Sequence, residues 1–180
     1  MHPLADTTQP TMTVEEFRSW AEGRDGRWEL MSGVPVRMQS ESRLHSRTSR
    51  RIAGLLEGML DGHVCTLDER VDVVCDEGEV RNPDILIDCA PEAATSTGAR
   101  AIRPVVVIEI AVTSQAYDLG GKHLICFRNP HVMHYIVVLP LEKRAMHAAR
   151  DGVLRLLEPG ETLALTSGPG MRIAVDDLIG

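Results

Sequence analysis

The pattern of apolar and polar positions divides the chain into helical and strand-like stretches. Apolar residues recur at helical spacing from Ser42 to Leu60, which predicts a helix with an apolar stripe on one side and arginines on the other. A shorter helix is expected from Val14 to about Glu22, because the Thr-Val-Glu-Glu run that begins at Thr13 has the spacing of a capping box. Glycine-containing turns follow both stretches and are expected to end the helices.

Strand-like segments fill most of the remaining chain. The run from Trp28 to Met38 predicts a hairpin that turns at Ser32-Gly33. Further stretches rich in branched apolar residues are expected to be strands: 63–75, 84–89, 104–112, 133–139, the hairpin of 145–149 with 153–157, and one or two weak strands in 161–180. A helix with its N-cap at Asp118 should run to about Phe127. This order of elements predicts an α/β (α+β) fold, in which a mixed sheet is flanked by helices.

The stretch from Pro104 to Val112 is the most apolar of the chain, and its unbroken apolar character is typical of a central strand covered on both faces. Glu109 interrupts it, and a carboxylate buried there needs a cationic partner, a metal ion or an open cleft. Asp84 begins a neighbouring apolar strand, so the two carboxylates could face each other and share a divalent cation. The structural alternative is that Asp84 caps a turn and Glu109 pairs with an internal arginine.

Three further residues are candidates to join these two acids. Lys122 is expected in the first turns of the helix after Asp118, where a lysine opposes the helix dipole; it either orients water and neutralises a phosphate or is an ordinary solvated lysine. Glu29 is a third candidate acid or an ordinary outward-facing strand glutamate. His45, near the start of the long helix, is expected to be a core or cleft-edge residue rather than a metal ligand.

At 180 residues the chain has the size of one domain. We expect a disordered leader over residues 1–12 and one domain over 13–180. No apolar run is long enough to span a membrane and no secretory signal is visible, so a cytoplasmic location is expected. The four cysteines form no C-x-x-C pair and are expected to be buried reduced thiols; they are Cys65, Cys75, Cys89 and Cys126.

The net charge of −7 argues against broad electrostatic binding of nucleic acid, although it leaves room for a local basic surface. The one dense positive cluster consists of Arg43, Arg47, Arg50 and Arg51, on the polar side of the long helix. These arginines either grip a phosphate backbone or form a solvated helix face. The sequence contains no zinc-protease spacing, phosphate-binding glycine loop or nucleophile elbow.

Four motifs, in this order, resemble the Uma-type family of restriction endonucleases within the PD-(D/E)XK nuclease superfamily. The motifs are Trp28-Glu29-Leu30-Met31-Ser32-Gly33, Arg81-Asn82-Pro83-Asp84, Val107-Ile108-Glu109-Ile110 and Tyr117-Asp118-Leu119-Gly120-Gly121-Lys122. The resemblance covers the chain from Thr13 to Leu178. It implies a restriction-endonuclease-like core, a mixed central sheet flanked by helices.

The resemblance also implies a set of site residues. Mg²⁺ or Mn²⁺ would be held by Asp84 and Glu109, with the Ile110 carbonyl as a third ligand. Glu29 matches the N-terminal acid of the family, and Lys122 matches a lysine that has moved from the strand to the following helix. The usual strand position holds Ala111, and the turn after the glutamate strand lacks the family's proline; an arginine often found beside Asp118 is replaced by Leu119.

Together these observations predict a metal-dependent DNA endonuclease that hydrolyses phosphodiester bonds with metal-activated water. The predicted catalytic residues are Glu29, Asp84, Glu109 and Lys122, and DNA is the expected partner. A homodimer would suit the cutting of two strands. Two alternatives remain: a catalytically inactive relative that binds nucleic acid, and a protein-interaction module with the same fold, which the acidic net charge favours.

Overall fold

The apolar stretch around Glu109 forms the centre of the largest sheet. In the computed structural model, β7 (Pro104–Ile110) pairs in parallel with β8 (His134–Leu139) and antiparallel with β6 (Ile85–Asp88). Every residue of β7 except Glu109 is buried. The prediction of a central strand covered on both faces is therefore confirmed.

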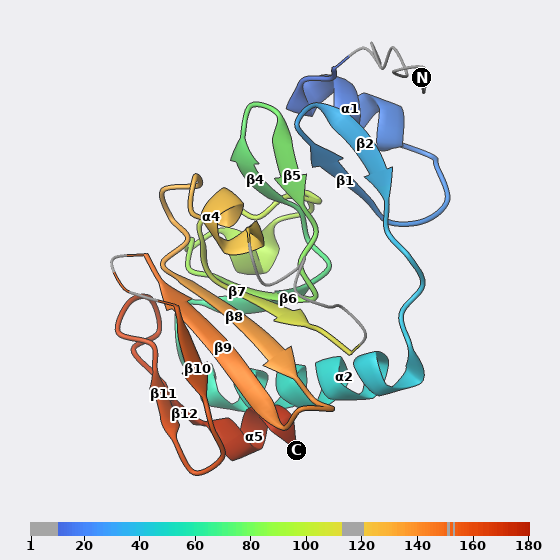
Figure 1. Cartoon of the computed structure of the whole chain (residues 1–180). Helices are drawn as coiled ribbons and strands as arrows, with labels where there is room; N and C mark the ends of the chain where they lie inside the picture. The colour runs from blue at the N-terminus through green and yellow to red at the C-terminus, as the bar shows by residue number, and fades with distance from the viewer. Residues whose placement is uncertain (1–10, 113–120, 151, 153) are drawn as a thin grey trace, which may run out of the picture.

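The structure describes residues 11–112, 121–150, 152 and 154–180 (Figure 1). Its helices are α1 (Val14–Ala21), α2 (Arg43–Met59), the 3₁₀ turn η1 (Ala93–Thr95), α4 (Lys122–Cys126) and α5 (Val175–Ile179). Its other strands are β1 (Trp28–Met31), β2 (Val34–Arg37), β3 (Thr66–Glu69), β4 (Val73–Asp76), β5 (Glu79–Arg81), β9 (Arg144–Ala149), β10 (Arg155–Leu157), β11 (Thr162–Ala164) and β12 (Arg172–Ala174).

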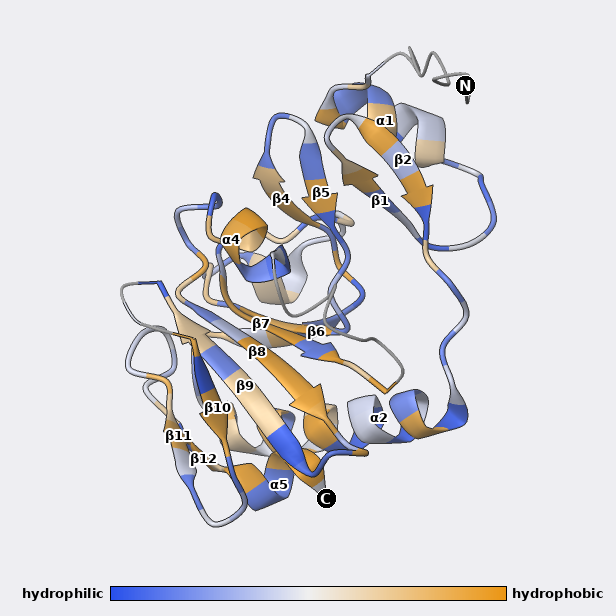
Figure 2. Cartoon of the chain, viewed as in Figure 1, coloured by the Kyte–Doolittle hydropathy of each residue, from blue (hydrophilic) through white to orange (hydrophobic). Residues whose placement is uncertain are grey.

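The six-stranded sheet has the order β10-β9-β8-β7-β6-β3 and is mixed, because β7 and β8 run parallel while the other neighbours run antiparallel. One face packs on α2 and α5, and the other packs on α4 and β4 (Figure 1). Successive side chains of β7 point to opposite faces, so Ile108 packs in the core with α2 and α5, and Val107 packs in the core with α4 and β4. The apolar residues concentrate between these layers (Figure 2). This mixed α+β arrangement agrees with the predicted fold class.

A smaller sheet of order β2-β1-β5-β4 carries the N-terminal elements. The capping box of α1 is present, with the Glu16 amide donating to Thr13 Oγ1 and the Thr13 amide donating to Glu16 Oε2. The β1–β2 hairpin turns at Ser32 and Gly33, whose φ angles of 51° and 79° are both left-handed, as a two-residue primed turn requires. Both local predictions are confirmed. Most of the expected leader lies outside the described residues, although Met12 is described and its amide donates to the Gly33 carbonyl.

Three parts of the secondary structure differ from the predictions. The expected strand run over 63–75 is two strands in different sheets, β3 and β4, separated near Arg70, which has a left-handed φ of 60°. Strand β5 was not predicted, because its Glu79 and Arg81 look like surface residues in the sequence; they are buried as an ion pair, with Arg81 Nη2 2.6 Å from Glu79 Oε2. The tail ends in α5, which is too short to leave a helical pattern. The expected N-cap Asp118 lies outside the described residues, and the described helix begins at Lys122.

No described helix combines the length and the apolar character that crossing a membrane requires.

The expectation of four reduced cysteines is wrong for two of them. Cys65 and Cys89 form a disulfide, while Cys75 and Cys126 are buried thiols. In the antiparallel pairing of β3 with β6, Thr66 lies opposite Asp88. Cys65 comes just before Thr66 and Cys89 just after Asp88, so the same register brings the two sulfurs together. This pairing could not be predicted from the sequence, because the two cysteines are 24 residues apart and meet only through the sheet register.

Thiol counting tests this pairing directly. In protein denatured without reductant, two thiols per chain should react with a thiol reagent, and after reduction all four should react. Four reactive thiols before reduction would contradict the disulfide, provided that the protein was purified without reductant.

Two buried histidines face each other across β8 and β9. His134 Nδ1 lies 3.0 Å from His147 Nε2, and the Ser167 amide donates to His134 Nε2. Since His134 Nε2 accepts that bond, its proton is on Nδ1, and His134 donates to His147. Burial, together with the nearby His134 and Arg155, lowers the pKa of His147 to about 4. The folded protein therefore keeps His147 neutral.

This pKa shift predicts that the protein loses stability as the pH falls. The unfolded chain takes up a proton at His147 near the ordinary pKa of 6.5, whereas the folded chain resists it until about 4, so the stability present above pH 6.5 is lost between these values. We expect a loss of about 3 kcal/mol over that window, since each pKa unit corresponds to about 1.4 kcal/mol. Urea unfolding at several pH values measures it. The variant His147→Gln should flatten this dependence, and His63→Gln, a change at an exposed histidine, should leave it unchanged.

Candidate metal and catalytic site

The two predicted acids of the central strands come to opposite positions in the sheet. In the antiparallel pairing of β6 with β7, Ile85 lies opposite Ile108. Continuing this register by one residue places Asp84 opposite Glu109. Residues directly opposite in an antiparallel pair project from the same face of the sheet, with their β-carbons about 5 Å apart. The sequence prediction that the two acids are neighbours is consistent with this register.

Asp84 is buried and held by neighbouring donors. Its Oδ2 accepts a hydrogen bond of 2.8 Å from the Ile110 amide and lies 2.9 Å from His45 Nε2. Its other oxygen, Oδ1, lies 3.7 Å from Arg27 Nη1. The bond to the Ile110 amide brings the backbone of that residue, whose carbonyl is a candidate ligand, next to the carboxylate. The alternative in which Asp84 merely caps a turn does not describe these contacts, because its partners come from β7, α2 and the segment before β1.

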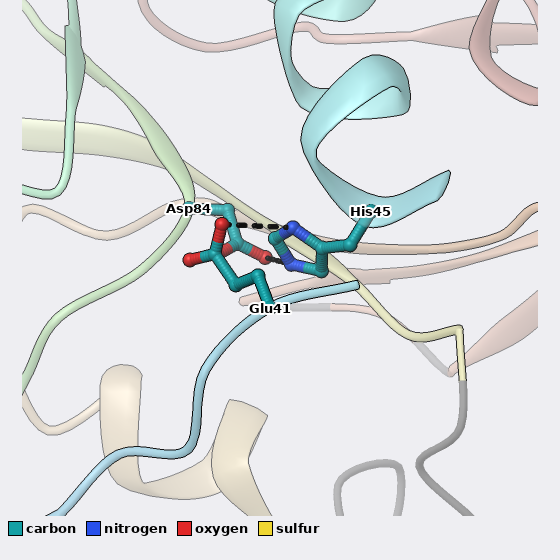
Figure 3. A group of neighbouring side chains, drawn as sticks. All are labelled: Glu41, His45 and Asp84. Atoms are coloured by element: carbon teal, nitrogen blue, oxygen red, sulfur yellow. Dashed lines mark hydrogen bonds and ion pairs between the residues drawn. The ribbon is translucent and has the colours of Figure 1, made fainter. Parts of the chain in front are cut away.

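A three-residue cluster forms around Asp84. Glu41, from the loop before α2, and His45, from the first turn of α2, approach it so that one ligand atom from each residue lies within 4.8 Å of the others (Figure 3). The imidazole stands between the two carboxylates, with Nδ1 3.2 Å from Glu41 Oε2. Within the described part of the chain this is the group of metal-binding side chains that meets this criterion. Carboxylate oxygens and an imidazole nitrogen are a donor set that fits a divalent metal ion.

The charge state of His45 follows from its position between the acids. Burial lowers its pKa, but the hydrogen bond to Asp84 and the negative charges of Asp84 and Glu41 outweigh that effect, so its pKa is raised overall. His45 is partly buried, with 12% of its side chain exposed, which agrees with the expected cleft-edge position, and its two carboxylate neighbours make it a candidate ligand as well. Sequence reasoning overlooked Glu41 altogether; its spacing of four residues before His45, across a helix start, was the signal that could have drawn attention to it.

Lys122 approaches Glu109, the residue opposite Asp84 in the sheet register. Lys122 Nζ lies 4.0 Å from Glu109 Oε1, and both side chains are partly buried, with 17% and 16% of their surface exposed. The structure thus brings the helix lysine to the strand glutamate. The expectation of a merely solvated lysine is not met.

Glu29 is buried, with 1% of its surface exposed, so the alternative of an outward-facing glutamate is wrong. Its Oε1 accepts a hydrogen bond from the Asn82 amide. The Asn82 side chain in turn donates to Asp72 Oδ1 and to the Arg70 carbonyl, and accepts from Arg27 Nε. Glu29 therefore anchors the turn that presents Asp84, and it does not belong to the Glu41–His45–Asp84 cluster.

An open groove of about 730 Å³ borders the cluster. Its lining includes Arg27, Arg37, Arg70 and Glu41. Two of these arginines contact Glu41: Arg27 through Nη1, and Arg70 with Nη2 2.6 Å from Oε2. A basic groove therefore lies beside the acids, at a place that the sequence analysis did not identify because its arginines come from separate segments.

The arginines predicted to hold nucleic acid are all exposed on α2. Arg51 donates to the carbonyls of Asp177 and Leu178, so it fastens α5 to α2. Arg47 lines a second, smaller hollow of about 250 Å³ next to Lys143 and the end of α5. The bonds of Arg51 give it a structural task, whereas the exposed positions of Arg43, Arg47 and Arg50 leave their guanidinium groups open to solvent.

A family model described as "Uma2: Putative restriction endonuclease" matches residues 14–176. The chain belongs to the Uma2 family. The match spans the four-stranded sheet, the six-stranded sheet and the β11–β12 pair, so the resemblance read from four short motifs is confirmed over nearly the whole chain.

Two similar proteins extend this result for the Uma2 chain. One is the "Uncharacterized protein slr1290" of Synechocystis sp. (strain ATCC 27184 / PCC 6803 / Kazusa), which is 29% identical over 174 residues and covers 93% of this chain and 90% of its own length. The other is the crystal structure of "a putative nuclease belonging to DUF820" from Anabaena variabilis ATCC 29413, with a TM-score of 0.73, 14% identity and coverage of 93% of this chain and 97% of its own. At that identity the likeness shows the fold, which is restriction-endonuclease-like.

The network around Asn82 predicts a stability effect that can be separated from chemistry. Replacing Asn82 by Ala removes the side-chain bonds to Arg27, Asp72 and the Arg70 carbonyl, and it takes this donor from the partly buried Asp72 carboxylate. We expect a loss of about 2 kcal/mol in the free energy of unfolding. Urea titration of Asn82→Ala beside Gln39→Ala, a change in an exposed loop, measures the difference. Equal stability of the two variants would contradict the role of Asn82.

Proposed function

We propose that this Uma2 protein is a metal-dependent DNA endonuclease that hydrolyses phosphodiester bonds. The observation that supports it most is the convergence of Asp84 with Glu109 by strand register and of Lys122 with Glu109 by direct approach. An acid pair with a nearby ammonium group is the arrangement expected for metal-assisted hydrolysis of a phosphate ester.

Two of the acids are ligands of a metal ion in this proposal. Asp84 and Glu109 would hold Mg²⁺ or Mn²⁺, with the Ile110 carbonyl as a third ligand. The donor chemistry fits, because hard divalent cations prefer carboxylate and carbonyl oxygens. When bound, such an ion supplies Lewis acidity at a phosphate oxygen and lowers the pKa of water from about 15.7 toward about 7.

The remaining residues would orient the attacking water, neutralise charge on the phosphate and hold Asp84 in place. Lys122, 4.0 Å from Glu109, would orient the attacking water or balance the negative charge that develops on the phosphate. Glu29 would act through Asn82, whose amide it accepts, and so fix the turn that carries Asp84. This makes Glu29 a positioning residue in the proposal rather than a group that touches the substrate.

DNA would approach from the side of the basic groove. Arg27, Arg37 and Arg70 line it beside the acids, which supplies local positive charge in a protein of net charge −7. The exposed Arg43, Arg47 and Arg50 of α2 would extend the contact with the phosphate backbone. A homodimer that cuts both strands stays a prediction.

Substitution of the buried aspartate tests the proposal. We expect Asp84→Asn to lower Mn²⁺-dependent nicking of supercoiled plasmid by more than about 100-fold, because the amide cannot replace an anionic ligand. Gel quantification of nicked and linear forms over time gives the rate. Asp61→Asn, the same change at an exposed acid, should keep the full rate.

The outcomes separate the alternatives. Nicking that is unchanged in Asp84→Asn would refute the assignment. Salt-dependent DNA binding in EDTA without cutting under any divalent metal would instead identify an inactive nucleic-acid-binding relative. Absence of any DNA binding would favour a protein-interaction module, which the acidic net charge alone would suggest.

A further inference from the structure

The cluster of Glu41, His45 and Asp84 has nearly the dimensions of an ion's ligand shell. Its three ligand atoms lie within 4.8 Å of one another. Two ligands of one ion, each bonded at about 2.0–2.3 Å, can be at most about 4.6 Å apart. The imidazole stands between the two carboxylates, so its ring must turn for one of its nitrogens and both acids to share one ion. The imidazole distinguishes this set from the acid pair alone and favours a transition metal over Mg²⁺.

The carboxylate of Glu41 is already neutralised by the protein itself. Arg27 Nη1 contacts its Oε1, and Arg70 Nη2 lies 2.6 Å from its Oε2. The same Oε2 lies 3.2 Å from His45 Nδ1, a buried nitrogen that makes no hydrogen bond. The oxygen that faces the imidazole is therefore the one that Arg70 holds. A metal ion bound between Glu41 and His45 must compete with this guanidinium.

The two arginines differ in how firmly they are held. Arg27 is fixed to Asn82, with Nε 2.8 Å from the side-chain oxygen and Nη2 2.7 Å from the carbonyl oxygen. Arg70 is half exposed, with 52% of its side chain open to solvent, and its described ion pair is the one with Glu41. Arg70 also lines the basic groove together with Arg37. Of the two, Arg70 is the side chain that can leave.

We propose that Glu41 and His45 extend the ligand set of Asp84, so that these three residues bind a divalent transition-metal ion, and that Arg70 occupies Glu41 until this ion enters. The ion and the Arg70 guanidinium then exclude each other at Glu41 Oε2. Once displaced, Arg70 turns into the groove and donates to a phosphate of the substrate. That last step rests on the proposed nuclease function, whereas the binding of the ion does not.

This exchange, in which the ion replaces Arg70 at Glu41 and Arg70 moves to a phosphate, couples the binding of the ion to the binding of the phosphate. If the ion frees Arg70 for phosphate, then phosphate contact must by the same factor strengthen the binding of the ion, because linkage between two sites is reciprocal. The protein would therefore hold its ion weakly until a phosphodiester is present. Without the exchange, the two arginines would only oppose the ion by charge repulsion.

Mn²⁺ binding to the full chain without DNA tests the ion site. The electron paramagnetic resonance signal of unbound Mn²⁺ gives the affinity, and the pulsed spectrum reports nitrogen coordination. We expect nitrogen coupling in the unaltered protein and its loss in His45→Gln. Affinity should fall about 10-fold or more in His45→Gln and Glu41→Gln. It should rise about 3- to 10-fold in Arg70→Gln, since one competing charge is removed. The controls His63→Gln and Arg172→Gln change exposed residues and should match the unaltered protein.

A second measurement tests the exchange. Fluorescence anisotropy of a labelled DNA duplex, with Lys122→Met present to prevent cleavage, should show tighter binding when Mn²⁺ is added. Adding Arg70→Gln should abolish that gain.

Mn²⁺ binding without nitrogen coupling, or with affinity unchanged in Glu41→Gln and His45→Gln, would overturn the ion site. Unchanged Mn²⁺ affinity in Arg70→Gln would overturn the exchange. Mn²⁺ binding with nitrogen coupling but no plasmid nicking would refute the nuclease function and leave the ion site standing.

Discussion

A buried aspartate is the constraint on which the arrangement of this protein's candidate site depends. A carboxylate removed from water must be matched by donors or cations, and Asp84 receives the Ile110 amide, the His45 imidazole and the more distant Arg27 guanidinium. These partners come from β7, α2 and the chain just before β1. The aspartate therefore ties the central sheet to the long helix and to the N-terminal hairpin, and the groove forms where the three meet.

The same constraint explains why so many charges gather there. Glu41 approaches Asp84 through His45, and two like charges at that separation repel unless cations lie beside them. Arg27 and Arg70 supply the positive charge from the protein itself. A site balanced in this way can be stable without metal and still accept one, provided that an arginine can leave. In the absence of a metal ion, the negative charge of Glu41 is thus neutralised by the two arginines.

Local signals in the sequence were sufficient wherever neighbours along the chain decide the structure. The capping box at Thr13, the Ser32-Gly33 turn and the apolar strand around Glu109 formed as predicted because each depends on residues close in sequence. Residues that act through tertiary contacts were missed or misread. Glu41 lies in a loop that reaches Asp84 only because α2 packs against β3 and β7. Strand β5 was missed because its charged residues are buried as a pair.

The position of the lysine follows from the two faces of the central strand. Alternation puts Val107, Glu109 and Ala111 on one side of β7, and Val107 and Ala111 pack in the same core as Cys126 of α4. The strand position two residues after Glu109 is thus filled by a small buried side chain, and α4 covers that face. A lysine at the start of α4 can reach the glutamate from above the same face, which is where Lys122 lies. The helix therefore brings the Lys122 ammonium group to the face of the sheet that carries Glu109.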